Sequence, residues 1–199
     1  SGLSLPGFGD GQQSKFSTKM AIDGTQLQAR EIKASLGASK IDGFVDIDFG
    51  QKPRPFANGT LSLSLLDAET LTGLVYTGIP GGDYSIGSQT TGEENPEDVI
   101  RPIFYGLDAD LALNAEKVRI AETYPMADSL AASVQLRDGD IALQNIRTQW
   151  ITGQLSGKIG IAQSSTARVM NGQLKLVDAE LGALANRAGW PKGLTGKTV

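Results

Sequence analysis

The sequence contains no cysteine and no histidine among its 199 residues. The first absence excludes disulfide bonds, a thiolate nucleophile and cysteine-ligated metal. The second excludes a Ser-His-Asp relay and removes the commonest zinc ligand. Paired carboxylates could still perform acid–base chemistry, so the absences lower the expectation of an enzyme without excluding one. We predict a non-enzymatic protein with no catalytic residue, no metal and no cofactor.

Basic residues are few and scattered. The 18 Lys and Arg are outnumbered by 22 Asp and Glu, which gives a net charge of −4. Nucleic-acid binding requires a concentrated basic surface, and the chain has no basic run, so we predict no nucleic-acid partner. No stretch approaches the ~20 apolar residues of a membrane-spanning helix. We expect membrane contact through segments outside this chain.

Aromatic residues make up only 6% of the chain, so Leu, Ile, Val and Ala must supply the core. In the stretch 130–184, apolar and polar residues alternate in several successive runs, as in 130–137 and 155–161. Period-two alternation places one class of side chain on each face of a strand. The stretch therefore predicts antiparallel strands that follow one another in a sheet with one apolar face.

Asp-Gly and Asn-Gly pairs punctuate these runs, at Asp23-Gly24, Asn58-Gly59, Asp138-Gly139 and Asn171-Gly172. Such pairs supply the positive φ angles of tight turns, so we predict turns there. The run 27–36 also shifts phase by one residue between Ala29 and Ile32, which predicts a β-bulge.

Helix signals are fewer. Asp67 and Asp178 are predicted helix caps, for short helices over 68–75 and 179–188, and Asn95-Pro96 marks another short helix start. A loop insertion is predicted at about 78–95. The fold class is thus mainly β: a curved antiparallel meandering sheet with one apolar face, plus two or three short helices.

An internal repeat is predicted from two segments that match in order. Both contain Asn-Gly, alternating leucines and Asp-Ala-Glu, with the matching elements 113 and 111 residues apart (171 − 58 and 178 − 67). Repeat-like halves at about 26–76 and 130–188 indicate a unit used twice. We expect residues 1–199 to form a single β-rich region of a longer chain.

Four motifs resemble the C-terminal region of the AsmA family of bacterial envelope proteins. They are LDADLALNAEKV at 107–118, LRDGDIAL at 136–143, TGQLSG at 152–157, and GQLKL at 172–176 followed by Asp178, Leu181 and Leu184. Each motif is a simple β pattern, but their order is that of the family. The resemblance covers 96–199 well and 26–74 more loosely.

The resemblance implies a periplasmic protein tethered to the inner membrane by a segment absent from this chain. The family is similar to bridge-like lipid transfer proteins, in which a long curled sheet forms an oil-lined groove. It is associated with outer-membrane biogenesis and homeostasis and with phospholipid transport, so phospholipid acyl chains become the expected partner.

A lipid-facing lining can be predicted from the alternating leucines, isoleucines and valines. For any single residue, packing in an ordinary core is the simpler interpretation, and the hypothesis concerns the face as a whole. The alternative is a non-enzymatic structural or adhesion-type β-domain that binds protein or glycan. The predicted lining comprises Leu61, Leu63, Leu65, Leu111, Leu113, Val134, Leu136, Ile141, Leu143, Leu155, Ile159, Ile161, Leu174 and Leu176.

Two further groups of residues could have either a binding role or an ordinary structural role. The carboxylate pairs Asp46/Asp48, Asp108/Asp110 and Asp138/Asp140 could attract Ca²⁺, but their places on polar faces and beside a turn favour solvated surface. Trp190 is predicted to be a packing anchor. For Trp150, the core side and the lipid side both remain open.

Overall fold

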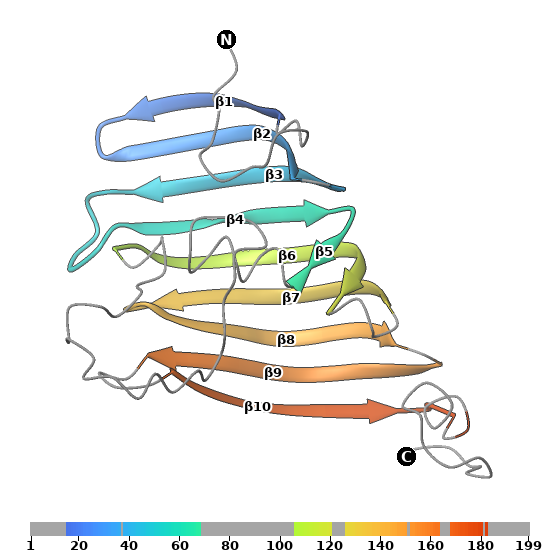
Figure 1. The fold of residues 1–199 in the computed structure, drawn as a ribbon. Helices are drawn as coiled ribbons and strands as arrows, with labels where there is room; N and C mark the ends of the chain where they lie inside the picture. Colours follow the sequence, from blue (N-terminus) through green and yellow to red (C-terminus); the bar gives the residue numbers. More distant parts are fainter. Residues whose placement is uncertain are drawn as a thin grey trace, which may run out of the picture.

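The computed structural model describes residues 15–36, 38–68, 106–120, 126–150, 152–163, 168–180 and 182. Ten strands form one sheet in the order β1-β2-β3-β4-β6-β7-β8-β9-β10, with β5 pairing beside β6. The sheet is open, because β1 and β10 lie at opposite edges (Figure 1). The predicted mainly β fold is confirmed.

The strands are long relative to the turns that join them. Their bounds are β1 (Lys15–Asp23), β2 (Gln26–Leu36), β3 (Ser39–Asp48), β4 (Phe56–Leu63), β5 (Leu66–Asp67), β6 (Asp108–Arg119), β7 (Ala127–Arg137), β8 (Asp140–Trp150), β9 (Gly153–Gln163) and β10 (Arg168–Val177).

The sheet is not the purely antiparallel meander that the sequence predicts. All consecutive neighbours pair antiparallel except β4 with β6, which pair parallel from Phe56↔Asp108 to Leu63↔Ala115. The short β5 also pairs parallel with β6. A parallel pair needs a crossover of a dozen or more residues, and the chain between Asp67 and Asp108 is longer than that. Alternation could not predict this step, because it carries no information on strand direction.

The predicted short helices are not seen among the described residues, whose elements are all strands. Of the first predicted helix the described ranges include only Ala68, and of the last only Ala179, Glu180 and Gly182; the helix start at Asn95 and the loop at 78–95 lie outside them. Asp67, a predicted cap, ends β5 and accepts a hydrogen bond of 3.1 Å from the Nε of Arg119.

The turn predictions divide into two outcomes. Gly24 and Asp138-Gly139 lie in turns with positive φ, as predicted. The predicted turns at Asn58-Gly59 and Asn171-Gly172 are wrong, because both pairs lie inside strands β4 and β10. At Gly59 an added Cβ would stand 2.2 Å from the carbonyl oxygen of Phe44. That glycine therefore permits the close approach of the next strand and does not form a turn.

The predicted β-bulge in β2 is confirmed. The pairing with β3 shifts between Ala29 and Ile32, and Glu31 has a φ of 50°. A second bulge, which the sequence did not predict, occurs in β8 at Asn145, with a φ of 54°. An extra residue of this kind bends its strand and sharpens the local twist.

The two bulges belong to two four-strand units, β1–β4 and β7–β10, that share one pattern of pairing. Asn145 follows Glu31 by the same interval that separates Gly157 from Gly43 (145 − 31 = 157 − 43 = 114). Three residue pairs of the first unit have an equivalent pair in the second. Ser17↔Lys33 corresponds to Ala131↔Arg147, and Ala29↔Val45 corresponds to Leu143↔Ile159. Gly43↔Leu61 corresponds to Gly157↔Leu174.

Asn145→Val is expected to lower the free energy of unfolding by about 1–2 kcal/mol, because a β-branched residue tolerates positive φ poorly. Asn145→Gly serves as the matched control and should stay within about 0.5 kcal/mol of the parent, since glycine adopts this conformation without steric cost. Urea unfolding measures both variants. Equal midpoints for the two would contradict a left-handed residue at this bulge.

Candidate functional site

The candidate site is a face of the sheet on which apolar side chains line up from strand to strand. Leu111 in β6 pairs with Val134 in β7, Val134 with Leu143 in β8, and Leu143 with Ile159 in β9. Directly paired residues point to the same side of a sheet. These four therefore form one apolar row across four adjacent strands.

Parallel rows extend this surface, which we call the apolar face. One runs through Ala57, Ala109, Leu136, Ile141, Ile161 and Met170, and another through Ile41, Leu63, Ala115, Leu130, Thr148, Leu155 and Leu176. Leu61 pairs with Leu113, and Leu174 with Gly157. Every residue of the predicted lining lies on the apolar face except Leu65, which stands between β4 and β5 and accepts a hydrogen bond of 2.5 Å from Ser39 Oγ through its carbonyl.

The apolar face is buried at its centre and exposed at its flanks. Leu63, Leu130 and Ile146 belong to one buried cluster, and Ala57, Ala109 and Leu136 form a second cluster. Along β10, in contrast, Met170 is 66% exposed and Leu174 is 51% exposed. On β1, Phe16 is 63% exposed. Contiguous exposed apolar surface of this kind marks an interaction site more often than isolated apolar residues do.

Sequence reasoning did not include Phe16, Met20 and Met170 in the lining. Their pairing places them on the apolar face, through Phe16↔Ala34, Met20↔Ala29 and Met170↔Ile161. The alternation of apolar and polar residues along 16–22 indicates the side on which Phe16 and Met20 lie, but only the position of a strand at a sheet edge determines exposure.

Trp150 packs against the buried cluster that contains Leu63 and Leu130. It ends β8 opposite Gly153, on the side of the apolar face. This contact fits a packing role. Trp190 lies outside the described residues.

The opposite face, which we call the polar face, carries cross-strand ion pairs at one end. Arg30 contacts Asp46 at 2.9 Å, and Arg137 contacts Asp110 at 2.8 Å. Arg54 reaches both Asp108 and Asp138. Partly exposed pairs of this kind contribute little to stability, about 0–1 kcal/mol each. Among the described residues, no three acidic side chains group as metal ligands.

Within the described part of the chain, no helix has the length and apolar character needed to span a membrane.

No protein-family model matches the chain, and no curated protein or solved structure is significantly similar to it.

Proposed function

We propose that this chain is a periplasmic domain of an AsmA-like envelope protein that binds or conducts phospholipid along the apolar face. In this proposal, a segment outside the chain anchors the protein to the inner membrane, and the domain serves outer-membrane biogenesis without enzymatic activity. The observation that carries the proposal is the continuity of the apolar face from β1 to β10, with exposed apolar side chains at both edges.

The dimensions of the face suit an acyl chain. Eight steps between neighbouring strands, each about 4.8 Å, give a width of about 38 Å. One leaflet of the hydrocarbon core of a bilayer is about 15 Å thick. Lipid tails can therefore lie across several strands, and each methylene group removed from water contributes about 0.8 kcal/mol.

The exposed flanks indicate where a lipid would first make contact. Leu174 and Met170 project from β10 on the apolar face, next to the half-buried Ile161 and Leu176 of the same surface. Because these side chains are accessible, a tail can cover them without displacing the buried centre. The proposal therefore places lipid contact at β9 and β10, one of the two exposed flanks.

A photocrosslinking residue, p-benzoylphenylalanine, at position 174 should form covalent adducts with phospholipid when the chain is exported to the periplasm of a Gram-negative host. The adjacent residue Gln173 is the matched control, because it lies on the same strand and points to the polar face. Mass spectrometry of the purified chain measures both adducts. We expect at least about tenfold more lipid adduct from position 174 than from position 173.

Equal yields at the two positions, together with no phospholipid in a solvent extract of the purified chain, would contradict the proposal. That result would favour the alternative of a non-enzymatic structural or adhesion-type domain.

A further inference from the structure

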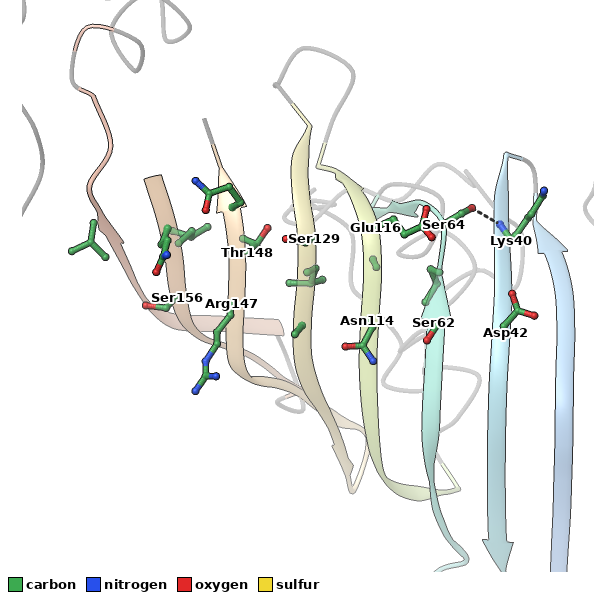
Figure 2. A pocket seen from close by; sticks show the side chains of 18 residues that line it. Lys40, Asp42, Ser62, Ser64, Asn114, Glu116, Ser129, Arg147, Thr148 and Ser156 are labelled. Carbon is green, nitrogen blue, oxygen red and sulfur yellow. Dashed lines mark hydrogen bonds between the residues drawn. The ribbon is translucent and has the colours of Figure 1, made fainter. Parts of the chain in front are cut away.

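The polar face contains a hollow of about 1110 Å³ at the end of the sheet opposite to the ion pairs of Arg30, Arg54 and Arg137. Figure 2 shows Asp42, Ser62, Asn114 and Arg147 along it, on β3, β4, β6 and β8. They lie on one cross-strand row, since Asp42 pairs with Ser62 and Ser62 with Asn114, and Asn114 and Arg147 flank Ala131 of β7.

The hollow forms because short side chains alternate with longer ones along this cross-strand row of the polar face. Ser62, Ala131 and Ser156 occupy the row at β4, β7 and β9, so the floor is low there. Ser129, which also lines the hollow, has a φ of 52° at a shift in the pairing of β7 with β8. A strained residue at a bulge is frequent beside binding sites, where it redirects neighbouring side chains.

The charged groups of the hollow differ from those at the other end of the polar face. Lys40, Asp42, Glu116 and Arg147 line it, and none of them forms an ion pair with a described residue. The arginines at the other end, Arg30, Arg54 and Arg137, are all paired. The charged groups of the hollow are therefore available to a ligand.

The chemistry of the lining narrows the ligand class. The two cations, Lys40 and Arg147, are balanced by the two anions, Asp42 and Glu116. A lining without net positive charge does not suit a polyanionic ligand. A hydrocarbon would leave the polar side chains without hydrogen-bond partners. An extended peptide pairs best at a sheet edge, whereas the backbone groups beneath the hollow are already paired within the sheet.

A sugar chain fits this lining. Each sugar hydroxyl both donates and accepts a hydrogen bond. Serine hydroxyls and the Asn114 amide do likewise, while Asp42 accepts and Arg147 donates charge-assisted bonds.

We propose that the hollow on the polar face binds an oligosaccharide, with Asn114 and Arg147 as its main hydrogen-bonding partners. The inference does not rest on the lipid proposal, because it concerns the opposite face of the sheet. A chain that binds sugar but crosslinks no lipid would support the sugar site and contradict the lipid proposal. A chain that crosslinks lipid but binds no sugar would overturn the sugar site and leave the lipid proposal standing.

The test titrates the full chain with chitohexaose, cellohexaose, maltohexaose and a hyaluronan hexasaccharide, by calorimetry and saturation-transfer NMR. We expect saturable binding of at least one of them. Asn114→Ala and Arg147→Ala should each raise its Kd roughly tenfold, the usual effect of losing one hydrogen bond to a charged or amide group. Both residues are exposed, so the variants should fold, which unchanged urea midpoints would verify.

Lys158→Ala and Gln173→Ala are the matched controls, because both residues are exposed and lie outside the lining. Each should leave the Kd within about twofold of the parent. The inference is overturned if no sugar binds saturably up to about 10 mM. It is also overturned if Asn114→Ala and Arg147→Ala bind as tightly as the two controls, or if the hollow takes up a peptide and no sugar.

Discussion

Valine in place of Gly157 is expected to lower the free energy of unfolding by about 3 kcal/mol or more. An added Cβ would stand 2.0 Å from the carbonyl oxygen of Gln173 and 3.0 Å from the Cα of Leu174. Both are backbone atoms of β10, so no side-chain rotation relieves the clash. The φ of Gly157, 151°, is in addition rare for residues with a side chain.

The size of this effect follows from the pairing of β9 with β10. Relief of the clash requires the two strands to separate, and separation breaks the hydrogen bonds of the ladder around Gly157↔Leu174. Small domains are stable by only about 5–15 kcal/mol. The substitution therefore removes a large part of the free energy of unfolding, and the urea concentration at the unfolding midpoint should be much lower than for the parent.

Gly106→Ala is the control for this prediction. Gly106 is exposed, and no atom lies within 4 Å of its added Cβ, so the free energy of unfolding should change by no more than about 0.5 kcal/mol. Gly43 is the equivalent of Gly157 in the first unit, with an added Cβ 2.1 Å from the oxygen of Thr60. Gly43→Val should lower the free energy of unfolding through the same clash with the neighbouring strand, without the added strain of a positive φ. A Gly157→Val chain that unfolds with the parent would refute the close approach of β9 and β10.

Aspartate at Leu174 is expected to reduce phospholipid bound to the purified chain by roughly 100-fold. A carboxylate that faces an acyl chain loses its hydration without gaining a partner, which costs about 3 kcal/mol or more. Because Leu174 is 51% exposed, the substitution should leave the fold intact. Quantitative mass spectrometry of extracted lipid measures the loss.

Leu113→Asp and Leu143→Asp should abolish lipid crosslinking as well, but both residues pack against the buried cluster. Their variants are therefore compared with the parent only where far-UV circular dichroism shows the same fold. Gln173→Asp adds the same charge to the polar side of β10 and should retain the parent amount of lipid. If Leu174→Asp and Gln173→Asp retained equal lipid, the apolar face would not be the binding surface.

The side on which each residue lies could be predicted from the sequence, because alternation depends only on strand geometry. The register of Leu111, Val134, Leu143 and Ile159 places them together as predicted. The bulge before Ile32 was also predictable, since a one-residue shift of phase leaves a visible trace in the pattern.

Other features depend on contacts between distant parts of the chain. Asn58-Gly59 has the composition of a turn, but the approach of Phe44 from β3 makes it part of a strand. Local sequence cannot distinguish these two uses of glycine. The hollow on the polar face was not predicted for the same reason: Ser62, Ala131 and Ser156 come to lie on one cross-strand row only through the register of β4 to β9.

The single parallel step between β4 and β6 determines how the two four-strand units are oriented. β7 stands five places along the sheet from β1, and β10 stands five places from β4. In a wholly antiparallel sheet, strand direction alternates at every step, so a displacement of five places would reverse the direction of every strand in the second unit relative to its equivalent in the first. The parallel step cancels that reversal, so the arrows of β4 and β10 run the same way (Figure 1). The two units are thus related by a shift along the sheet, combined with its twist, and equivalent strands run in the same direction. The outer edge of β10 therefore corresponds to the edge of β4 that pairs with β6, so the pattern of pairing does not by itself end the sheet at β10.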